Sequence, residues 1–133
     1  MTSSKLKEFY SELGKNYSEE LYVHKSGWGK ARTRFIKKLL LRYANNNICL
    51  DVGCGGGVFL RIIDKSRPKL LIGIDISHST LLRAKANSKT AILICADAEV
   101  LPIKTSSVDL ILCSETLEHL ENPEYLFSEA FRA

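Results

Sequence analysis

The chain has 133 residues, which is about the length of one domain. Its apolar fraction of 45% and charged fraction of 26% are ordinary for a soluble globular protein, and they exclude a disordered, collagen-like or coiled-coil chain. No apolar stretch approaches the ~20 residues that a membrane span requires, and no signal peptide is recognisable at the start, so we expect a cytoplasmic protein. The cysteines lack zinc-site spacing, and we expect them to be reduced and to pack as small apolar residues: Cys49, Cys54, Cys95 and Cys113.

Positive charge is concentrated in the first third of the chain. Residues 1–47 carry ten Lys/Arg and four Asp/Glu (+6), whereas residues 48–133 carry nine and eleven (−2). Apolar residues at three- and four-residue spacing predict an amphipathic helix there, with one apolar face: Trp28, Ala31, Phe35, Leu39 and Tyr43. The basic residues opposite are either the solvated surface of that helix or a surface for an anionic partner such as RNA. We expect residues 1–47 to form a basic helical cap on a single domain.

Short apolar runs from residue 48 onward predict strands that are buried on both faces: 48–52, 70–74, 91–95 and 108–113. The connections contain 17, 16 and 12 residues, which is enough for the crossovers that parallel strands need. Helical patterns occupy 58–64, 77–86 with Ser77 as N-cap, and 124–132. This alternation predicts an α/β fold, with a doubly wound parallel sheet preceded by N-terminal helices. Ligands of such sheets bind at the carboxyl ends of the strands.

A glycine-rich loop follows the first predicted strand. It has the spacing D-x-G-x-G-x-G over residues 51–57, and it differs from the dinucleotide fingerprint because Val58 stands where that motif needs glycine. Such a loop lets the backbone approach a ligand closely and directs helix amides at an anionic group. Asp75 and Asp97 end the next two strands, where one carboxylate could accept from ribose hydroxyls and the other from an adenine amine.

In combination, these motifs resemble the class I S-adenosylmethionine-dependent methyltransferases, in particular the branch with the ubiquinone and menaquinone biosynthesis enzymes. The resemblance covers most of residues 48–133 and rests on four segments: 50–57, 73–77, 96–102 and 107–119. It implies a Rossmann-like sheet with strand order 3-2-1-4, S-adenosylmethionine as cofactor, and methyl transfer to a small-molecule or RNA acceptor. The alternative is a non-catalytic cofactor-binding or scaffold module that a partner chain completes.

The resemblance implies which residues lie at the methionine part of the cofactor. Gly53, Cys54 and Gly55 would pass under it. Asp51 would hold the loop and face the cofactor's amino group. Ser114 would lie beside the same part of the cofactor.

The resemblance also assigns the nucleoside part. Asp75 would bind the ribose hydroxyls, and Ile76 would pack on the adenine. Asp97 and Ala98 would meet the adenine edge. No catalytic acid or base is identified, and none is required unless the acceptor must lose a proton, because the cofactor already carries an activated methyl group.

Two further groups of residues allow two interpretations each. Glu115, Glu118 and His119 share roughly one face if they are helical, and they either bind a divalent cation or shape the substrate-side turn; we predict no metal. Tyr10 or Tyr17 either closes over the site from the N-terminal helices or packs in the core.

The number of strands is smaller than the resemblance implies. Members of the family usually have seven strands, and the four predicted here suggest truncation after the fourth. The strand at 108–112 would then be an uncovered sheet edge, which favours pairing with another chain. We therefore expect a homodimer or a partner that covers this edge.

Overall fold

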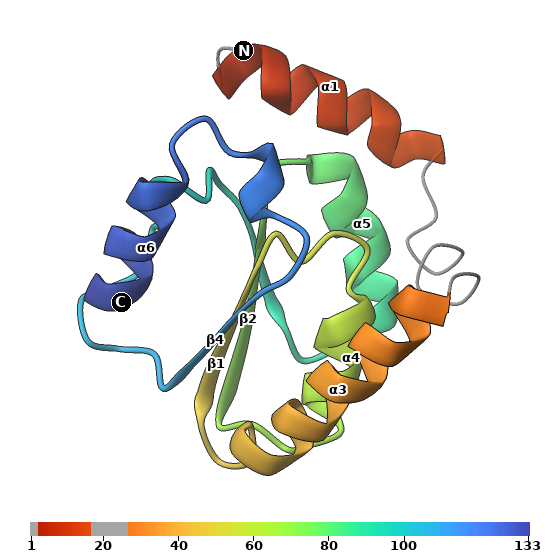
Figure 1. Cartoon of the computed structure of the whole chain (residues 1–133), viewed down its shortest axis with the longest axis vertical. Coiled ribbons are helices and arrows are strands. Elements are labelled where there is room, and N and C mark those ends of the chain that lie inside the picture. The colour runs from red at the N-terminus through yellow and green to blue at the C-terminus, as the bar shows by residue number, and fades with distance from the viewer. Residues whose placement is uncertain (1–2, 17–26) are drawn as a thin grey trace.

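The structure is a computed structural model that describes residues 3–16 and 27–133 of the chain. Figure 1 shows α1 at one end of the molecule, beyond the carboxyl ends of the strands. The elements in chain order are α1 (Ser3–Asn16), α3 (Gly27–Tyr43), β1 (Ile48–Val52), α4 (Val58–Asp64), β2 (Leu70–Asp75), α5 (His78–Asn87), β3 (Ile92–Cys95), β4 (Leu110–Cys113), the 3-10 helix η1 (Leu117–His119) and α6 (Pro123–Arg132).

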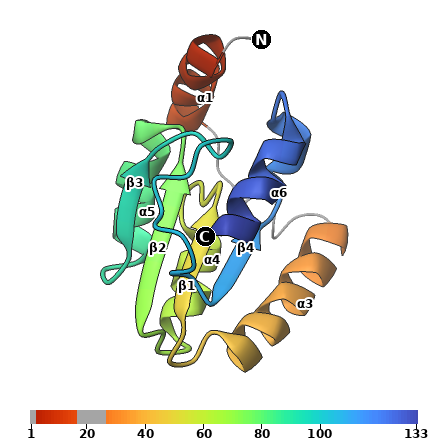
Figure 2. The ribbon, with the colours of Figure 1, turned by 90° about the vertical axis from the view of Figure 1, so that its left-hand side faces the viewer.

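The four strands form one parallel sheet in the order β3-β2-β1-β4, which confirms the predicted fold class and strand order (Figure 2). β1 is central, and its Leu50 is paired with Ile72 of β2 and with Ile111 of β4. The apolar runs are nearly continuous because the sheet is covered on both faces. The parallel arrangement brings the carboxyl ends of all four strands to the same edge.

Alternate residues of the strands face two separate cores, as the two-residue repeat of a strand requires. Cys49 and Leu71 belong to the core that contains buried residues of α3, α4 and α5. Leu50 and Ile72 belong to the opposite core, where they are joined by Leu126 of α6. The fold is therefore three-layered, and the central strands are shielded from solvent on both sides.

Most predicted elements are present, and their ends differ by one or two residues. Ser77 is the N-cap of α5, as predicted, and its Oγ accepts from the backbone N–H of Thr80 at 3.3 Å. β4 begins at Leu110 rather than at residue 108. The N–H of Val108 donates to the carbonyl of Ala133 at 3.0 Å, beside the end of α6, and the bonds to β1 begin only with the Asp109 N–H, which donates to the carbonyl of Ile48 at 2.9 Å.

The predicted apolar face of the helix at residues 28–43 is wrong. Trp28 is 74% exposed and Phe35 is 62% exposed. The helix α3 instead buries Gly29 and Leu40 on the side that packs on α4, with Ile36 partly buried beside them. Two overlapping sets of residues have helical spacing in this segment, and only the contact with α4 decides which of them is buried.

The surface of the molecule bears on two other predictions. Among the described residues β4 pairs with β1 alone, so its outer edge is open. No helix in the described part of the chain has the length and apolar character to cross a membrane.

All four cysteines are free thiols. Burial raises the pKa of the Cys49 thiol to about 11, with a smaller contribution from the Asp109 carboxylate.

Gly73, in the middle of β2, allows α4 and the glycine loop to pack closely on the sheet. A Cβ atom at this position would lie 2.9 Å from Leu60 Cδ1 and 3.0 Å from both Cys54 Sγ and Leu93 Cδ2. The space for a side chain is therefore already filled by three neighbours, although strand propensity alone would favour a β-branched residue.

We expect Gly73→Val to lower the free energy of unfolding by about 1–3 kcal/mol, which is the usual cost of overpacking a core. The measurement is a chemical denaturation curve of each variant. Gly27→Ala is the matched control, because nothing lies within 4 Å of a Cβ atom there. A Gly73→Val protein as stable as the wild type would show that the neighbouring side chains move aside freely.

Candidate functional site

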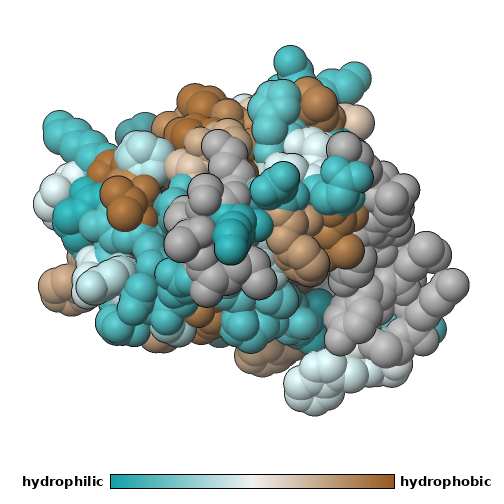
Figure 3. Space-filling view, turned by 90° about the horizontal axis from the view of Figure 1, so that it is seen from above, coloured by the Kyte–Doolittle hydropathy of each residue, from teal (hydrophilic) through white to brown (hydrophobic). Residues whose placement is uncertain are grey.

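A cavity of about 710 Å³ lies at the carboxyl ends of the strands. Its wall combines the loops that follow β1, β2, β3 and β4 with residues of α1 and α3. Figure 3 looks onto this end of the molecule and shows apolar side chains grouped among hydrophilic ones. The cavity is thus at the edge that the strand pattern predicts for ligand binding.

The glycine loop is fixed to the neighbouring strand by its backbone. The N–H groups of Gly53 and Cys54 donate to the carbonyl of Ile74 at 2.8 and 2.9 Å. Gly53 has a φ of 71°, and a Cβ atom there would lie 2.0 Å from Thr116 Oγ1. Because Gly53 has no side chain, the loop can pass directly beneath the segment that follows β4.

Asp75 connects the end of β2 to the glycine loop. Its Oδ2 accepts from the N–H of Gly55 at 2.8 Å. Its Oδ1 accepts from the N–H of Ser77 at 2.8 Å and from Thr80 Oγ1 at 3.1 Å. An ionised carboxylate has about four acceptor positions, so these bonds leave capacity for a ligand hydroxyl. The carboxylate is therefore oriented before any ligand arrives.

The structure brings all but one of the residues predicted for the site to the wall of the cavity. Those on the wall are Gly53, Cys54, Gly55, Asp75, Ile76, Asp97, Ala98 and Ser114. They come from the ends of four different strands. Asp97, the outermost acid, accepts from the N–H of Glu99 at 2.9 Å, which fixes the turn after β3.

Asp51 is the predicted site residue that does not line the cavity. It is 2% exposed and lies within β1, beneath the glycine loop. Its carboxylate is close enough to contribute to a raised pKa of Cys113, although burial of the thiol is the larger cause. Asp51 is therefore buried below the glycine loop and does not reach the side of the loop that faces the cavity.

Arg32 of α3 is a wall residue that the sequence did not single out. It lies half-buried at the cavity and forms an ion pair with Glu115, which follows β4. Its Nε is buried and has no hydrogen-bond partner among the described residues. In the sequence Arg32 is one of many cations in a segment without acids, and nothing there separates it from those exposed on the helix surface.

Helix α1 closes one side of the cavity. Tyr10 lies on the wall and makes an edge-to-face contact with His119 of η1, with ring centroids 5.4 Å apart. Burial raises the pKa of Tyr10, and the carboxylates of Glu118 and Asp75 raise it further. Tyr10 is therefore at the site and not in the core. Tyr17, the other tyrosine considered, lies outside the described residues.

Glu115, Glu118 and His119 do not share one helical face. η1 begins only at Leu117, and Glu115 has a left-handed backbone with a φ of 59°. Glu115 points to Arg32, as the ion pair shows. Within residues 3–16 and 27–133 no group of three His, Cys, Asp or Glu side chains is arranged to hold a metal ion.

Comparison with known proteins gives a family for this arrangement. The family model described as "Methyltransferase domain" matches residues 50–133. The chain is 32% identical over 99 residues to a ubiquinone biosynthesis O-methyltransferase of Coxiella burnetii, a match that covers 67% of this chain. It is 34% identical over 105 residues to a malonyl-[acyl-carrier protein] O-methyltransferase of a Marinomonas species, which covers 74% of this chain.

Two solved structures illustrate the shared fold. An S-adenosylmethionine-dependent methyltransferase from Mesorhizobium loti superposes with a TM-score of 0.69 at 25% identity, covering 84% of this chain and 49% of that one. Phosphoethanolamine N-methyltransferase 1 of Haemonchus contortus, solved with phosphoethanolamine and S-adenosylhomocysteine, has a TM-score of 0.78 at 18% identity, covering 99% and 30%. The second likeness concerns the fold alone.

The chain matches less than half of the length of these two curated relatives. The chain spans 42% of the length of the Coxiella protein and 37% of the Marinomonas protein. The family match nevertheless covers residues 50–133, which include nearly all of the sheet and the cavity residues from the loops after the strands. On that match, the chain belongs to the methyltransferase domain family.

Proposed function

We propose that the chain binds S-adenosylmethionine at the carboxyl ends of its strands and is the cofactor-binding part of a methyltransferase with a small-molecule acceptor. The observation that carries this proposal is the Asp75 carboxylate, which is held on the glycine loop by the Gly55 N–H at 2.8 Å while it lines the cavity. This pairing supports the proposal, because a carboxylate that could accept from ribose hydroxyls lies directly beside a glycine-rich backbone turn.

The residues on the wall suit the parts of this cofactor. Asp75 accepts the ribose hydroxyls, and Ile76 packs against the adenine. Asp97 and Ala98 meet the adenine edge, one strand further out. Each polar part of the nucleoside then faces an acceptor or a backbone group, as buried polar groups require.

The methionine part lies over Gly53, Cys54 and Gly55, beside Ser114. Its carboxylate fits Arg32, whose buried Nε needs an acceptor. Asp51 supports the loop from below. The sulfonium of the cofactor supplies an activated methyl group, so the chain has to bind, align and exclude water rather than activate the donor.

The acceptor in this proposal is a small molecule, and the protein is cytoplasmic. RNA is the second candidate, because cations exposed on α3 could meet phosphates: Lys30, Arg34, Lys37, Lys38 and Arg42. Within the described part of α3, Arg32 is the one cation on the cavity wall. The exposed cations therefore support a solvated helix surface better than an acceptor site.

We further propose that a second copy or a partner covers the open edge of β4.

We expect Asp75→Asn to weaken the binding of S-adenosylmethionine by about 10- to 100-fold, because hydrogen bonds to a charged group contribute ~1.5–3 kcal/mol. The measurement is calorimetric titration with S-adenosylmethionine, and with NAD as a ligand that should not bind. Glu124→Gln is the charge-matched control, since Glu124 is exposed on α6 outside the cavity. Unchanged affinity in a folded Asp75→Asn protein would remove Asp75 from the site.

Arg32→Leu tests the methionine end separately. We expect the substitution to weaken the binding of S-adenosylmethionine by roughly tenfold, because an ionic hydrogen bond to the methionine carboxylate is lost. Methylthioadenosine lacks the carboxylate, and its affinity should stay as in the wild type. Arg34→Leu is the control, because Arg34 is exposed on the same helix. An equal loss for both ligands would show that Arg32 acts on the cavity as a whole and not on the carboxylate.

A further inference from the structure

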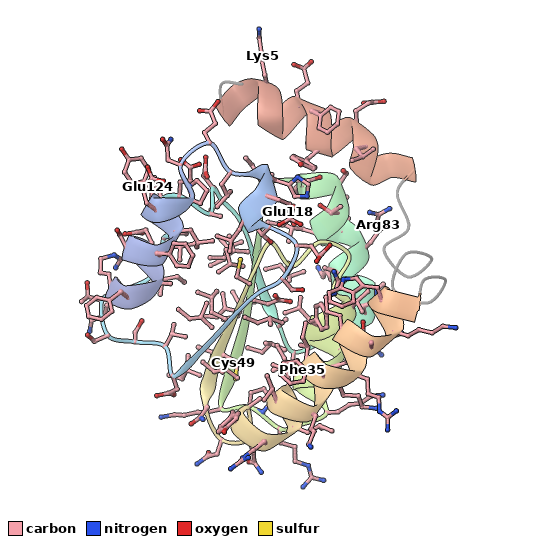
Figure 4. All side chains as sticks on the ribbon, viewed as in Figure 1. Lys5, Phe35, Cys49, Arg83, Glu118 and Glu124 are labelled. Atoms are coloured by element: carbon pink, nitrogen blue, oxygen red, sulfur yellow. The ribbon has the colours of Figure 1, made fainter. Side chains whose placement is uncertain are left out.

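One side of the cavity is not used by the proposed cofactor contacts. Tyr10 of α1 and His119 of η1 meet there edge to face, with an interplanar angle of 69°. Glu118 lines the same side, and Figure 4 shows it between α1 and the sheet. We call these three residues the mouth of the cavity. They are the groups that an acceptor would meet on its way to the cofactor.

The mouth is bordered by apolar side chains of α1. Phe9 and Leu13 line the cavity and are 52% and 41% exposed. The helix is held over α5 by Ser79 Oγ, which donates to the carbonyl of Ser11 at 2.9 Å. An acceptor that enters beside α1 can therefore bury an apolar body against these two side chains.

The charges around the mouth do not cancel. Arg32, the cation on the wall, is paired with Glu115. Asp75 is bonded to backbone N–H groups of the loop and of α5. Glu118 has no ion pair with any described residue, and its carboxylate contributes to the raised pKa of Tyr10. Glu118 therefore adds to the mouth a carboxylate that no cation of the described residues pairs with.

We propose that Glu118 selects the acceptor by charge, so that the mouth accepts an uncharged or cationic molecule with an apolar body and rejects an anionic one. The physical basis is that a fixed charge at a binding site opposes a ligand of the same sign and favours a ligand of the opposite sign. This inference rests on the proposed function, because it assigns the side of the cavity that the cofactor leaves free.

The experiment compares three small aromatic probes that differ mainly in charge: phenethylamine, phenethyl alcohol and phenylacetate. Each is titrated by NMR into the protein saturated with S-adenosylhomocysteine. We expect phenethylamine to bind about tenfold more tightly than phenylacetate, with the alcohol between them, because each charge contact at an exposed carboxylate changes affinity by roughly threefold. In Glu118→Gln the ratio of the two charged probes should fall to about threefold or less.

Glu124→Gln removes the same charge from an exposed residue of α6 and should leave the ratio as in the wild type. Salt of about 1 M should reduce the ratio in the wild type, because it screens an exposed charge. Equal binding of the two charged probes, a ratio that Glu118→Gln does not change, or no binding of any probe would each overturn the proposal.

The two proposals fail in different ways. If S-adenosylhomocysteine does not bind the wild-type protein, the proposed function fails. The same titrations without S-adenosylhomocysteine then still measure the charge ratio and its dependence on Glu118. If S-adenosylhomocysteine binds and the ratio does not depend on Glu118, only the inference about the acceptor fails.

Discussion

The hydrogen bond between Asp75 and the Gly55 N–H is the contact on which the candidate site depends. It joins the end of β2 to the glycine loop that follows β1, with the Gly55 N–H and the carboxylate 2.8 Å apart. The same carboxylate accepts from Ser77, at the start of α5. One partly buried acid thus sets the positions of the loop, the strand end and the helix start, which orients the cavity wall before a ligand binds.

The two cores keep this edge of the sheet in place. Gly73 lets the sheet approach Leu60 and Cys54 closely on one side, while α6 covers the other side through Leu126. The connection between β3 and β4 is held against α6 by Arg132, which donates to the carbonyls of Leu101 and Ile103 at 3.1 and 2.6 Å. The turn that carries Asp97 and Ala98 is therefore bounded by ordered backbone.

The strand ends and the helices outside the sheet contribute different parts of the cavity. The loops after the strands form the wall that we assign to the cofactor, whereas α1 and η1 supply the mouth, with Tyr10 and His119 in contact. Two similar proteins have different names, a ubiquinone biosynthesis O-methyltransferase and a malonyl-[acyl-carrier protein] O-methyltransferase. A division of this kind lets the acceptor side change while the sheet stays the same.

The sequence by itself determined the parallel sheet, its strand order through the family resemblance, and the cluster formed by the glycine loop, Asp75 and Asp97. These features follow from local patterns, because continuous apolar runs mark buried strands and residues at strand ends must meet at one edge. Only the tertiary structure decided the buried face of α3 and the positions of Arg32 and Tyr10 on the cavity wall. Helical spacing allows several faces, and only the packing of α4 on α3 in the folded protein selects one.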